Sequence, residues 1–225
     1  MIEAIIFDFD GVLADSNKVK IEAYYLIFED IEGSKEIIDT VTEENHKDNR
    51  YGIISKVLER LREKGKIHYQ DLDTEVQKYA KSYSEITEKG QIEAAEIDGT
   101  TEALERLKEK RYRLFIHTAT TDDSIMKVLD ARGIKDYFEG IYGSSRGNKD
   151  EVLQLIIDEN GLSPDKMISI GDGNSELEAA TRLGITFIAL ANESNDFAER
   201  DNLKYVIYDN LTELLDIVEK ISKNE

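Results

Sequence analysis

The second half of the chain alternates short apolar strands with amphipathic helices. Strand patterns such as residues 112–120 and 166–173 are each followed by a helical pattern, and the alternation continues to the end of the 225 residues. Strands that alternate with helices pair in parallel, because each helix carries the chain back over the sheet in a right-handed crossover. The pattern therefore predicts an α/β fold with a Rossmann-like parallel sheet core, covered by helices on both faces.

A further strand pattern, residues 3–8, has no neighbour of its kind until residue 112. The stretch between them instead shows the apolar spacing of amphipathic helices, for example in "YGIISKVLERLREKG". We therefore expect a helical insertion after the first strand of the α/β domain. The predicted division is a catalytic core of residues 1–15 and 95–225 and an α-helical cap domain of residues 16–94.

Ligands of open parallel sheets bind beyond the carboxyl ends of the strands, so the residues that follow each strand indicate the functional site. Four segments bring chemically useful groups to this edge: Asp8 with Asp10, Thr118 with Ala119, Lys149, and Asp172 with Glu176. Each motif alone has an ordinary explanation, since a threonine commonly caps a helix and a lysine at a helix start is commonly a solvated charge. Their convergence on one edge favours a functional site.

Two carboxylates only two residues apart repel each other unless a positive group lies near them. Mg²⁺ prefers carboxylate and water oxygens, and it takes a few protein ligands together with substrate phosphate. Asp8 and Asp172 would hold the ion, the segment at Asp10 would add a backbone carbonyl, and Glu176 is a further candidate ligand. We therefore predict Mg²⁺ as the cofactor.

The same residues suit phosphoryl transfer. An aspartate such as Asp8 is a competent nucleophile toward phosphorus and forms an aspartyl-phosphate. A second carboxylate, Asp10, could protonate the leaving oxygen and later activate water. Thr118 can donate a hydrogen bond to a phosphoryl oxygen, and Lys149 can neutralise the charge of the transferring group.

Four motifs together resemble those of the haloacid dehalogenase-like hydrolase superfamily: "FDFDGVLADS", "FIHTATT", "GNKDEV" and "ISIGDGNSELEAATRLG". They are similar above all to its phosphatases of the phosphoglycolate phosphatase and β-phosphoglucomutase kind, with a helical cap at the same place in the chain. The resemblance implies that Asp8 is the nucleophile and Asp10 the general acid and base. It also implies that Thr118 binds phosphate, that Lys149 stabilises the pentavalent state and that Asp172 completes the Mg²⁺ site. The dehalogenases themselves lack the second aspartate, so Asp10 favours phosphoryl chemistry.

The chain departs from the family pattern in two places. Glu176 stands where an aspartate is usual, and its longer side chain changes how it would reach a metal. The motif around Thr118 lacks the asparagine that often follows, so the phosphate contacts of Thr118 and Ala119 are less well defined by the resemblance. Neither departure removes a group that the mechanism requires.

The leading function is a Mg²⁺-dependent phosphatase that hydrolyses a small phosphorylated metabolite through an aspartyl-phosphate. A phosphomutase of the β-phosphoglucomutase type is an alternative, and a requirement for a bisphosphate activator would distinguish the two. A non-catalytic, phosphate-binding regulator is a second alternative. The intact Asp8, Asp10, Lys149 and Asp172 speak against it.

The charge balance bears on possible partners. Asp and Glu total 48 against 29 Lys and Arg, giving a formal net charge of −19, so no nucleic-acid partner is expected. A phosphate site in such a protein must be locally cationic. No apolar run approaches the roughly 20 residues that cross a bilayer and no secretory signal pattern is present, so we expect no membrane partner and a cytoplasmic location. The sequence leaves the oligomeric state open.

The insertion is expected to recognise the part of the substrate that the sheet edge does not hold. The stretch from Glu44 to Gly52, "ENHKDNRYG", is the candidate for these contacts, because it mixes polar and basic residues ahead of a well-formed helix pattern. An exposed loop between cap helices explains the same stretch. The physiological substrate is not indicated.

Overall fold

A computed structural model describes residues 1–45 and 48–223. The chain contacts divide into two compact units. Unit 1 comprises Met1–Asn17 and Gln91–Glu225, and unit 2 comprises Lys18–Gly90. The predicted division into core and cap, after residue 15 and before residue 95, stays a prediction. In the described part of the chain, no helix combines the length and apolarity that a membrane crossing needs.

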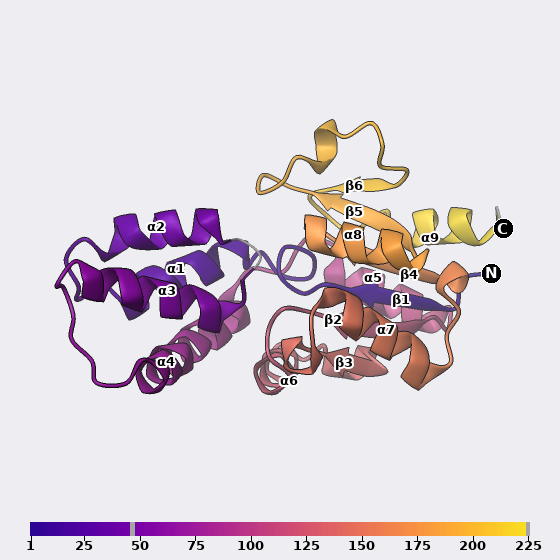
Figure 1. Ribbon diagram of the computed structural model, residues 1–225. Coiled ribbons are helices and arrows are strands. Elements are labelled where there is room, and N and C mark those ends of the chain that lie inside the picture. The colour runs from indigo at the N-terminus through magenta and orange to yellow at the C-terminus, as the bar shows by residue number, and fades with distance from the viewer. Residues whose placement is uncertain (46–47, 224–225) are drawn as a thin grey trace. The chain divides into compact units, whose positions relative to one another are not determined.

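The described residues of unit 1 form a six-stranded, fully parallel sheet, which confirms the predicted α/β class (Figure 1). The strand order is β3-β2-β1-β4-β5-β6. The strands are β1 (Ala4–Phe7), β2 (Arg113–His117), β3 (Gly140–Tyr142), β4 (Met167–Gly171), β5 (Thr186–Ala191) and β6 (Val206–Tyr208). The order reverses between β1 and β4, and such a reversal is where open α/β sheets bind ligands.

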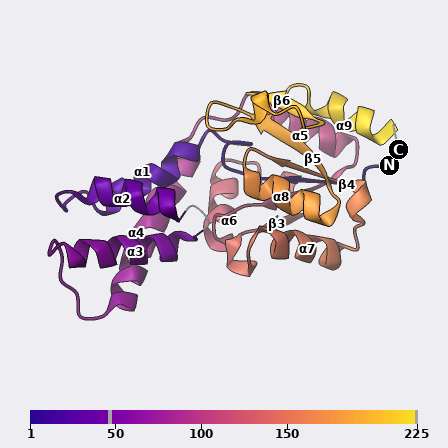
Figure 2. The same cartoon turned by 45° about the horizontal axis from the view of Figure 1, so that its top comes forward.

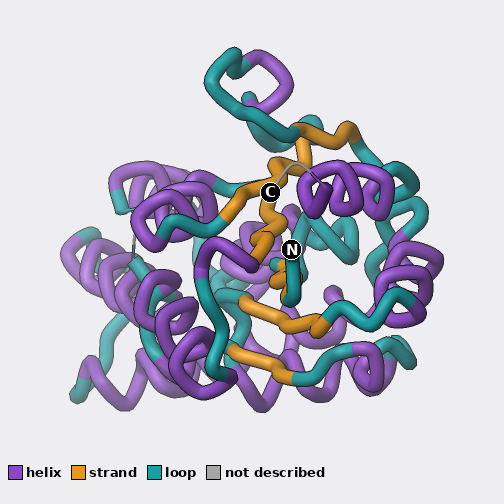
Figure 3. Tube along the Cα trace, turned by 90° about the vertical axis from the view of Figure 1, so that its right-hand side faces the viewer, coloured by secondary structure: helices purple, strands orange, loops and turns teal. Residues whose placement is uncertain are grey.

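Helices cover both faces of this sheet, as Figures 2 and 3 show. On one face lie α5 (Thr100–Glu109), α6 (Asp122–Ala131) and α9 (Leu214–Lys223), and on the other lie α7 (Lys149–Asn160) and α8 (Asn174–Leu183). Alternate residues of β1 supply the two cores, because successive side chains of a strand point to opposite faces. Ile5 and Phe7 pack with the first group of helices, whereas Ala4 and Ile6 pack with the second.

Short 3₁₀ turns connect several of these elements. They are η1 (Lys135–Tyr137), η2 (Ser144–Arg146), η3 (Pro164–Lys166) and η4 (Phe197–Glu199). In η2, Ser144 donates its N–H to the carbonyl oxygen of Thr120 at 2.9 Å. This hydrogen bond connects the segment after β3 to the segment after β2, near the predicted site.

Helices built around a separate apolar core make up unit 2. They are α1 (Asn17–Ile27), α2 (Ser34–Glu44), α3 (Arg50–Glu63) and α4 (Leu72–Glu93), of which α1 and α4 run across the unit boundaries. Aromatic side chains join them: the rings of Phe28 and Tyr79 stack with their centroids 4.5 Å apart. The sequence pattern did not single out α2, because it is rich in β-branched residues that lower helix propensity.

The two segments that connect the units pair with each other inside unit 1. Ala14 and Glu96 form an antiparallel bridge. Asp15 donates its N–H to Ala95 O at 2.9 Å, and Ile97 donates its N–H to Leu13 O at 3.2 Å. The residues on either side of the insertion are therefore held close to the end of β1.

Candidate active site

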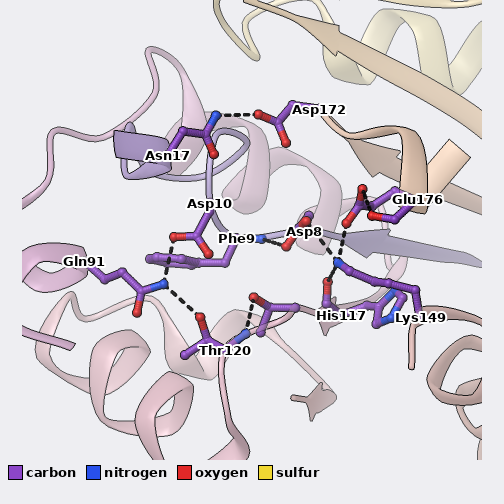
Figure 4. Close-up of polar contacts among 12 residues, drawn as sticks. Asp8, Phe9, Asp10, Asn17, Gln91, His117, Thr120, Lys149, Asp172 and Glu176 are labelled. Carbon is purple, nitrogen blue, oxygen red and sulfur yellow. Dashed lines mark hydrogen bonds and ion pairs between the residues drawn. The ribbon is translucent and has the colours of Figure 1, made fainter. Parts of the chain in front are cut away.

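Asp8 follows the last residue of β1, at the carboxyl edge of the sheet. Its backbone N–H donates to Ile170 O of β4 at 3.0 Å, which fixes its place between the two strands. Its side chain is almost buried: Oδ1 accepts the N–H of Phe9 at 2.7 Å, and Oδ2 accepts Nζ of Lys149 at 3.0 Å (Figure 4). The carboxylate is thus oriented from both sides.

Lys149 is the first residue of α7. A capping box formed by Asn148 and Glu151 fixes this helix start. Besides Asp8, the ammonium group contacts Glu176 Oε1 at 2.5 Å and His117 O at 3.3 Å. Burial alone would lower the pKa of Lys149, but the Asp8 and Glu176 carboxylates outweigh burial and raise it. A permanent cation therefore lies beside Asp8 in an otherwise acidic protein.

Glu176 lies in the first turn of α8 and is buried. Its Oε1 pairs with Lys149, and its Oε2 accepts a hydrogen bond from Ser175 Oγ at 2.9 Å. Burial would raise the pKa of the Glu176 carboxyl, but the Lys149 charge and the hydrogen bonds hold it well below its usual range. In this structure Glu176 thus orients Lys149, and its predicted contact with a metal stays a prediction.

Asp10 lies two residues beyond Asp8 and is also buried. Its Oδ1 accepts two hydrogen bonds, from Ser16 Oγ at 2.6 Å and from Gln91 Nε2 at 2.7 Å. Gln91 donates a second bond to Thr120 Oγ1 at 2.9 Å. Gln91 was not a predicted site residue, because nothing in its local sequence pattern distinguishes it from other polar residues of a helix.

The segment after β2 provides Thr118 and Ala119. Thr118 is buried and donates its N–H to Tyr142 O at 3.1 Å, while its Oγ1 accepts the N–H of Thr120 at 3.2 Å. Ala119 is the exposed residue between these two buried threonines. A hydroxyl that accepts one hydrogen bond retains its own hydrogen to donate, so Thr118 can bind an anion at this edge.

Asp172 directly follows β4. Its Oδ2 accepts hydrogen bonds from Asn17 Nδ2 at 2.6 Å and Asn192 Nδ2 at 3.1 Å. Burial raises the pKa of the Asp172 carboxyl; the two asparagines oppose this effect, and the negative charges of Glu176 and Asp10 add to it. The carboxylates at this edge therefore repel one another.

The donor set at this edge fits a hard divalent cation. Asp8, Asp10 and Asp172 provide oxygen ligands, and a cation would offset the burial and the repulsion that together raise the pKa of Asp172. Gly11 supplies the room, since a Cβ at that position would lie 2.0 Å from Asp172 Oδ2. Among the described residues, however, no three acidic or imidazole side chains lie together at distances that would hold a metal. Asn17 and Lys149 lie against the carboxylates instead.

His117 is the last residue of β2 and is buried beside Lys149 and Glu176. Burial, followed by the charge of Lys149, lowers the pKa of His117 well below its usual value, so the imidazole is neutral. Its carbonyl oxygen, which contacts Lys149, is the part of this residue that serves the site.

The chain is similar to proteins of a known family. A family model described as haloacid dehalogenase-like hydrolase matches residues 5–190. The chain is similar to a phosphorylated carbohydrates phosphatase of Thermotoga maritima, with 28% identity over 194 residues and 82% of each chain covered. It is also similar to a phosphoglycolate phosphatase of Aquifex aeolicus, with 28% identity over 200 residues and 84% of each chain covered.

Solved structures share the fold. A predicted phosphoglycolate phosphatase from Haemophilus somnus has a TM-score of 0.76 at 17% identity, covering 96% of this chain and 98% of that one. A candidate beta-phosphoglucomutase from Thermotoga maritima has a TM-score of 0.72 at 22% identity, covering 97% and 99%. A candidate HAD-hydrolase, YfnB from Bacillus subtilis bound to magnesium, has a TM-score of 0.72 at 19% identity, covering 96% of this chain and 98% of that one.

Proposed function

The chain belongs to the haloacid dehalogenase-like hydrolase family, and from this membership we propose that it is a Mg²⁺-dependent phosphatase. Its substrate is a small phosphorylated metabolite, and the reaction passes through an aspartyl-phosphate on Asp8. The observation that carries the proposal is the buried Asp8 carboxylate, held by the Phe9 N–H and by Lys149, with the second carboxylate, Asp10, two residues further on.

In the first half of the reaction, Asp8 attacks the phosphorus atom. The bond between phosphorus and the leaving oxygen breaks as the bond to the Asp8 carboxylate forms, and Asp10 gives its proton to the leaving oxygen. Lys149 neutralises charge on the phosphoryl group, while the Thr118 hydroxyl and the N–H of Ala119 donate to its oxygens. The dephosphorylated product leaves as an alcohol.

In the second half, water attacks the phosphorus atom and the bond to Asp8 breaks. Asp10 now accepts the proton of that water, which returns it to the protonated state in which the cycle began. Inorganic phosphate leaves, and Asp8 is free to react again. One carboxyl group thus serves as acid and then as base, and no other proton carrier is required.

Mg²⁺ would be held by Asp8 and Asp172 with the segment at Asp10, and Glu176 stays a further candidate. When bound, the ion supplies positive charge to the phosphoryl oxygens and offsets the repulsion among the carboxylates. Asn17 and Asn192 orient the Asp172 carboxylate and lower the cost of burying it. The acidic balance of the whole chain makes such local neutralisation necessary.

Unit 2 is proposed to recognise the leaving group. Within the candidate stretch from Glu44 to Gly52, residues 46 and 47 lie outside the described residues. Arg50 donates from Nη1 to Ser84 Oγ at 2.7 Å, and its guanidinium lies 5.6 Å from the centroid of the Tyr83 ring. The contacts of this stretch with a substrate stay a prediction, as do the cytoplasmic location and the expected lack of nucleic-acid and membrane partners.

Release of inorganic phosphate tests the proposed activity. Sugar phosphates, phosphoglycolate, glycerol 3-phosphate and nucleotides would be incubated with the protein in Mg²⁺ and in EDTA. We expect release from at least one compound in Mg²⁺ and loss of release in EDTA, because the carboxylate cluster needs a cation to bind an anionic substrate. Activity that requires a bisphosphate and yields an isomer would show a mutase. Binding of phosphate without turnover of any compound would show a regulator.

Gly11→Ala is expected to lower the rate of phosphate release strongly and to lower the unfolding free energy only modestly. Gly11 has a φ of +71°, and its new Cβ would lie 2.0 Å from Asp172 Oδ2 and 2.3 Å from Asn17 Nδ2. Side-chain ends can swing away at small cost, but Asp172 then leaves its position, so we expect a loss of kcat of about tenfold or more. Phosphate-release kinetics and urea denaturation would be measured together.

Gly133→Ala is the matched control for this variant. Gly133 has a φ of +70°, and nothing lies within 4 Å of the position of its Cβ. Both variants should therefore lose about 1–2 kcal/mol of unfolding free energy from the left-handed backbone. Only Gly11→Ala should lose activity. Equal activity in the two variants would argue against a role for the position of Asp172.

A further inference from the structure

Gln91 is a fully buried polar side chain at the sheet edge. Its Nε2 donates to Asp10 Oδ1 at 2.7 Å and to Thr120 Oγ1 at 2.9 Å (Figure 4). Burying a carboxamide is costly unless it forms hydrogen bonds, and both of these bonds lead to residues of the candidate site. Its position inside unit 1 therefore calls for an explanation beyond packing.

The Gln91 amide is oriented so that its NH₂ group, and not its oxygen, faces Asp10 and Thr120. Within the described residues, Gln91 Oε1 is buried and accepts no hydrogen bond. Turning the amide over would place that oxygen against the Asp10 carboxylate oxygen, where the two would repel each other. The observed arrangement thus leaves one acceptor unsatisfied while Asp10 and Thr120 each receive a donor.

The backbone at Gln91 is fixed as well. Arg132 Nη1 donates to the carbonyl oxygens of Gln91 at 3.0 Å, Ile92 at 3.2 Å and Ala94 at 2.8 Å. These carbonyls lie at and just beyond the end of α4, where the helix provides no donors of its own. Arg132 therefore anchors the end of α4 to unit 1, and the Gln91 side chain starts from a fixed point.

Gln91 joins two segments that the sheet brings to the same edge. Asp10 follows β1, and Thr120 lies in the loop after β2, where its N–H donates to Thr118 Oγ1. The Gln91 carboxamide thus contacts Asp10, the proposed acid and base, directly. It is linked to Thr118, the proposed phosphate contact, through Thr120.

We propose that Gln91 is a positioning residue for Asp10, an inference that rests on the proposed phosphatase mechanism. Gln91 and Ser16 together hold Asp10 Oδ1, so the proton that Asp10 exchanges with the leaving oxygen is carried on Oδ2. Proton transfer depends steeply on this placement, since an error of about 1 Å in a reacting group costs on the order of a hundredfold in rate. Gln91 itself touches no reacting atom.

The dependence on the leaving group tests this role. Gln91→Met keeps the length of the side chain and removes both donors. The probes are 2,4-dinitrophenyl phosphate, whose leaving group departs without a proton, and glycerol 3-phosphate or the fastest alkyl phosphate of the phosphate-release panel. The parameter kcat/KM reports events up to phosphorylation of Asp8, so it isolates the step in which Asp10 acts as an acid.

We expect Gln91→Met to lower kcat/KM for the alkyl phosphate by about tenfold to a hundredfold and for the dinitrophenyl ester by less than about threefold. An equal loss on both probes, or no loss on either, would overturn the positioning role. If the wild-type protein releases phosphate from neither probe, the proposed phosphatase function itself fails, and this inference fails with it. The two failures are therefore distinguishable.

Two further variants provide a second test of the proposal and a control. Gln91→Asn retains the amide but withdraws it by about 1.5 Å, the length of one carbon–carbon bond, so it should show the same selective loss even if Gln91→Met folds poorly. Thr87→Val is the control on α4, since Thr87 is buried and bonds to Tyr83 O of its own helix at 2.9 Å. It should leave the ratio of the two kcat/KM values unchanged, and a changed ratio would assign the effect to α4 in general.

Discussion

Asp8→Asn is expected to lower the kcat for phosphate release by at least about a thousandfold. The asparagine keeps the shape of the side chain and can still accept the Phe9 N–H, but its amide is not a nucleophile toward phosphorus. Lys149 retains its contact with Glu176, so the site should stay folded. The measurement is steady-state phosphate release in Mg²⁺ with the best substrate of the panel.

Another aspartate of the same loop, Asp15, provides the control. Asp15 is exposed, and its backbone N–H donates to Ala95 O. Asp15→Asn makes the same change of charge and should retain nearly full activity. Acid quenching of the wild-type reaction with labelled substrate should trap phosphate on the protein, and Asp8→Asn should trap none. Turnover that survives in Asp8→Asn would rule out the aspartyl-phosphate.

The strand and helix pattern was sufficient to predict the core. Both faces of β1 are covered, so its residues form a continuous apolar run that ends abruptly at Asp8. The parallel arrangement follows from the alternation with helices, and the position of the insertion follows from the isolated first strand. These features are local in the sequence, which explains why the α/β class and the family could be recognised without coordinates.

The contacts within the candidate site were less accessible from sequence. Asp8, Thr118 and Asp172 each follow a strand, so topology alone brings them together. By contrast, Gln91 and Asn192 reach the site from distant segments, and neither belongs to a motif. The role of Gln91 depends on where α4 ends, and the role of Asn192 depends on how the chain turns after β5. The spacing of residues in the sequence predicts neither of these features.

The pairing of Glu176 shows a further limit of sequence reasoning. Its spacing from Asp172 suggests a metal ligand, and so does the family pattern. In the structure its carboxylate contacts Lys149 at 2.5 Å, and this contact holds the cation that pairs with Asp8. A metal ligand and a partner of Lys149 would both use the carboxylate oxygens of Glu176. The three-dimensional contact was therefore needed to identify the pairing with Lys149.

Lys149→Met is expected to reduce both activity and stability. The variant removes the positive charge beside the phosphoryl group, so kcat should fall on the order of a thousandfold. It also leaves two almost buried carboxylates, Asp8 and Glu176, without the cation that contacted both. Breaking such a buried pair costs about 3–5 kcal/mol of unfolding free energy. Urea denaturation in the presence of EDTA, monitored by circular dichroism, would measure this loss.

The pH dependence of that loss identifies its cause. In the wild type, the lowered pKa of Glu176 gives stability that is present above its unfolded value of 4.5 and is lost as the pH falls. The raised pKa of Lys149 gives stability that is present below 10.5 and is lost as the pH rises above it. Without the lysine, burial raises the pKa of Glu176 above 4.5, so the variant should lose stability as the pH rises from 4.5 to 8.

A double variant separates the two effects of Lys149. In Lys149→Met/Glu176→Gln the buried Glu176 charge is gone, so most of the unfolding free energy should return and the decline above pH 4.5 should shrink. Phosphate release should stay as low as in Lys149→Met, because the lysine charge beside the phosphoryl group is still missing. If the double variant recovers activity along with stability, Lys149 only supports the fold, and the charge that stabilises the transferring phosphoryl group must come from elsewhere.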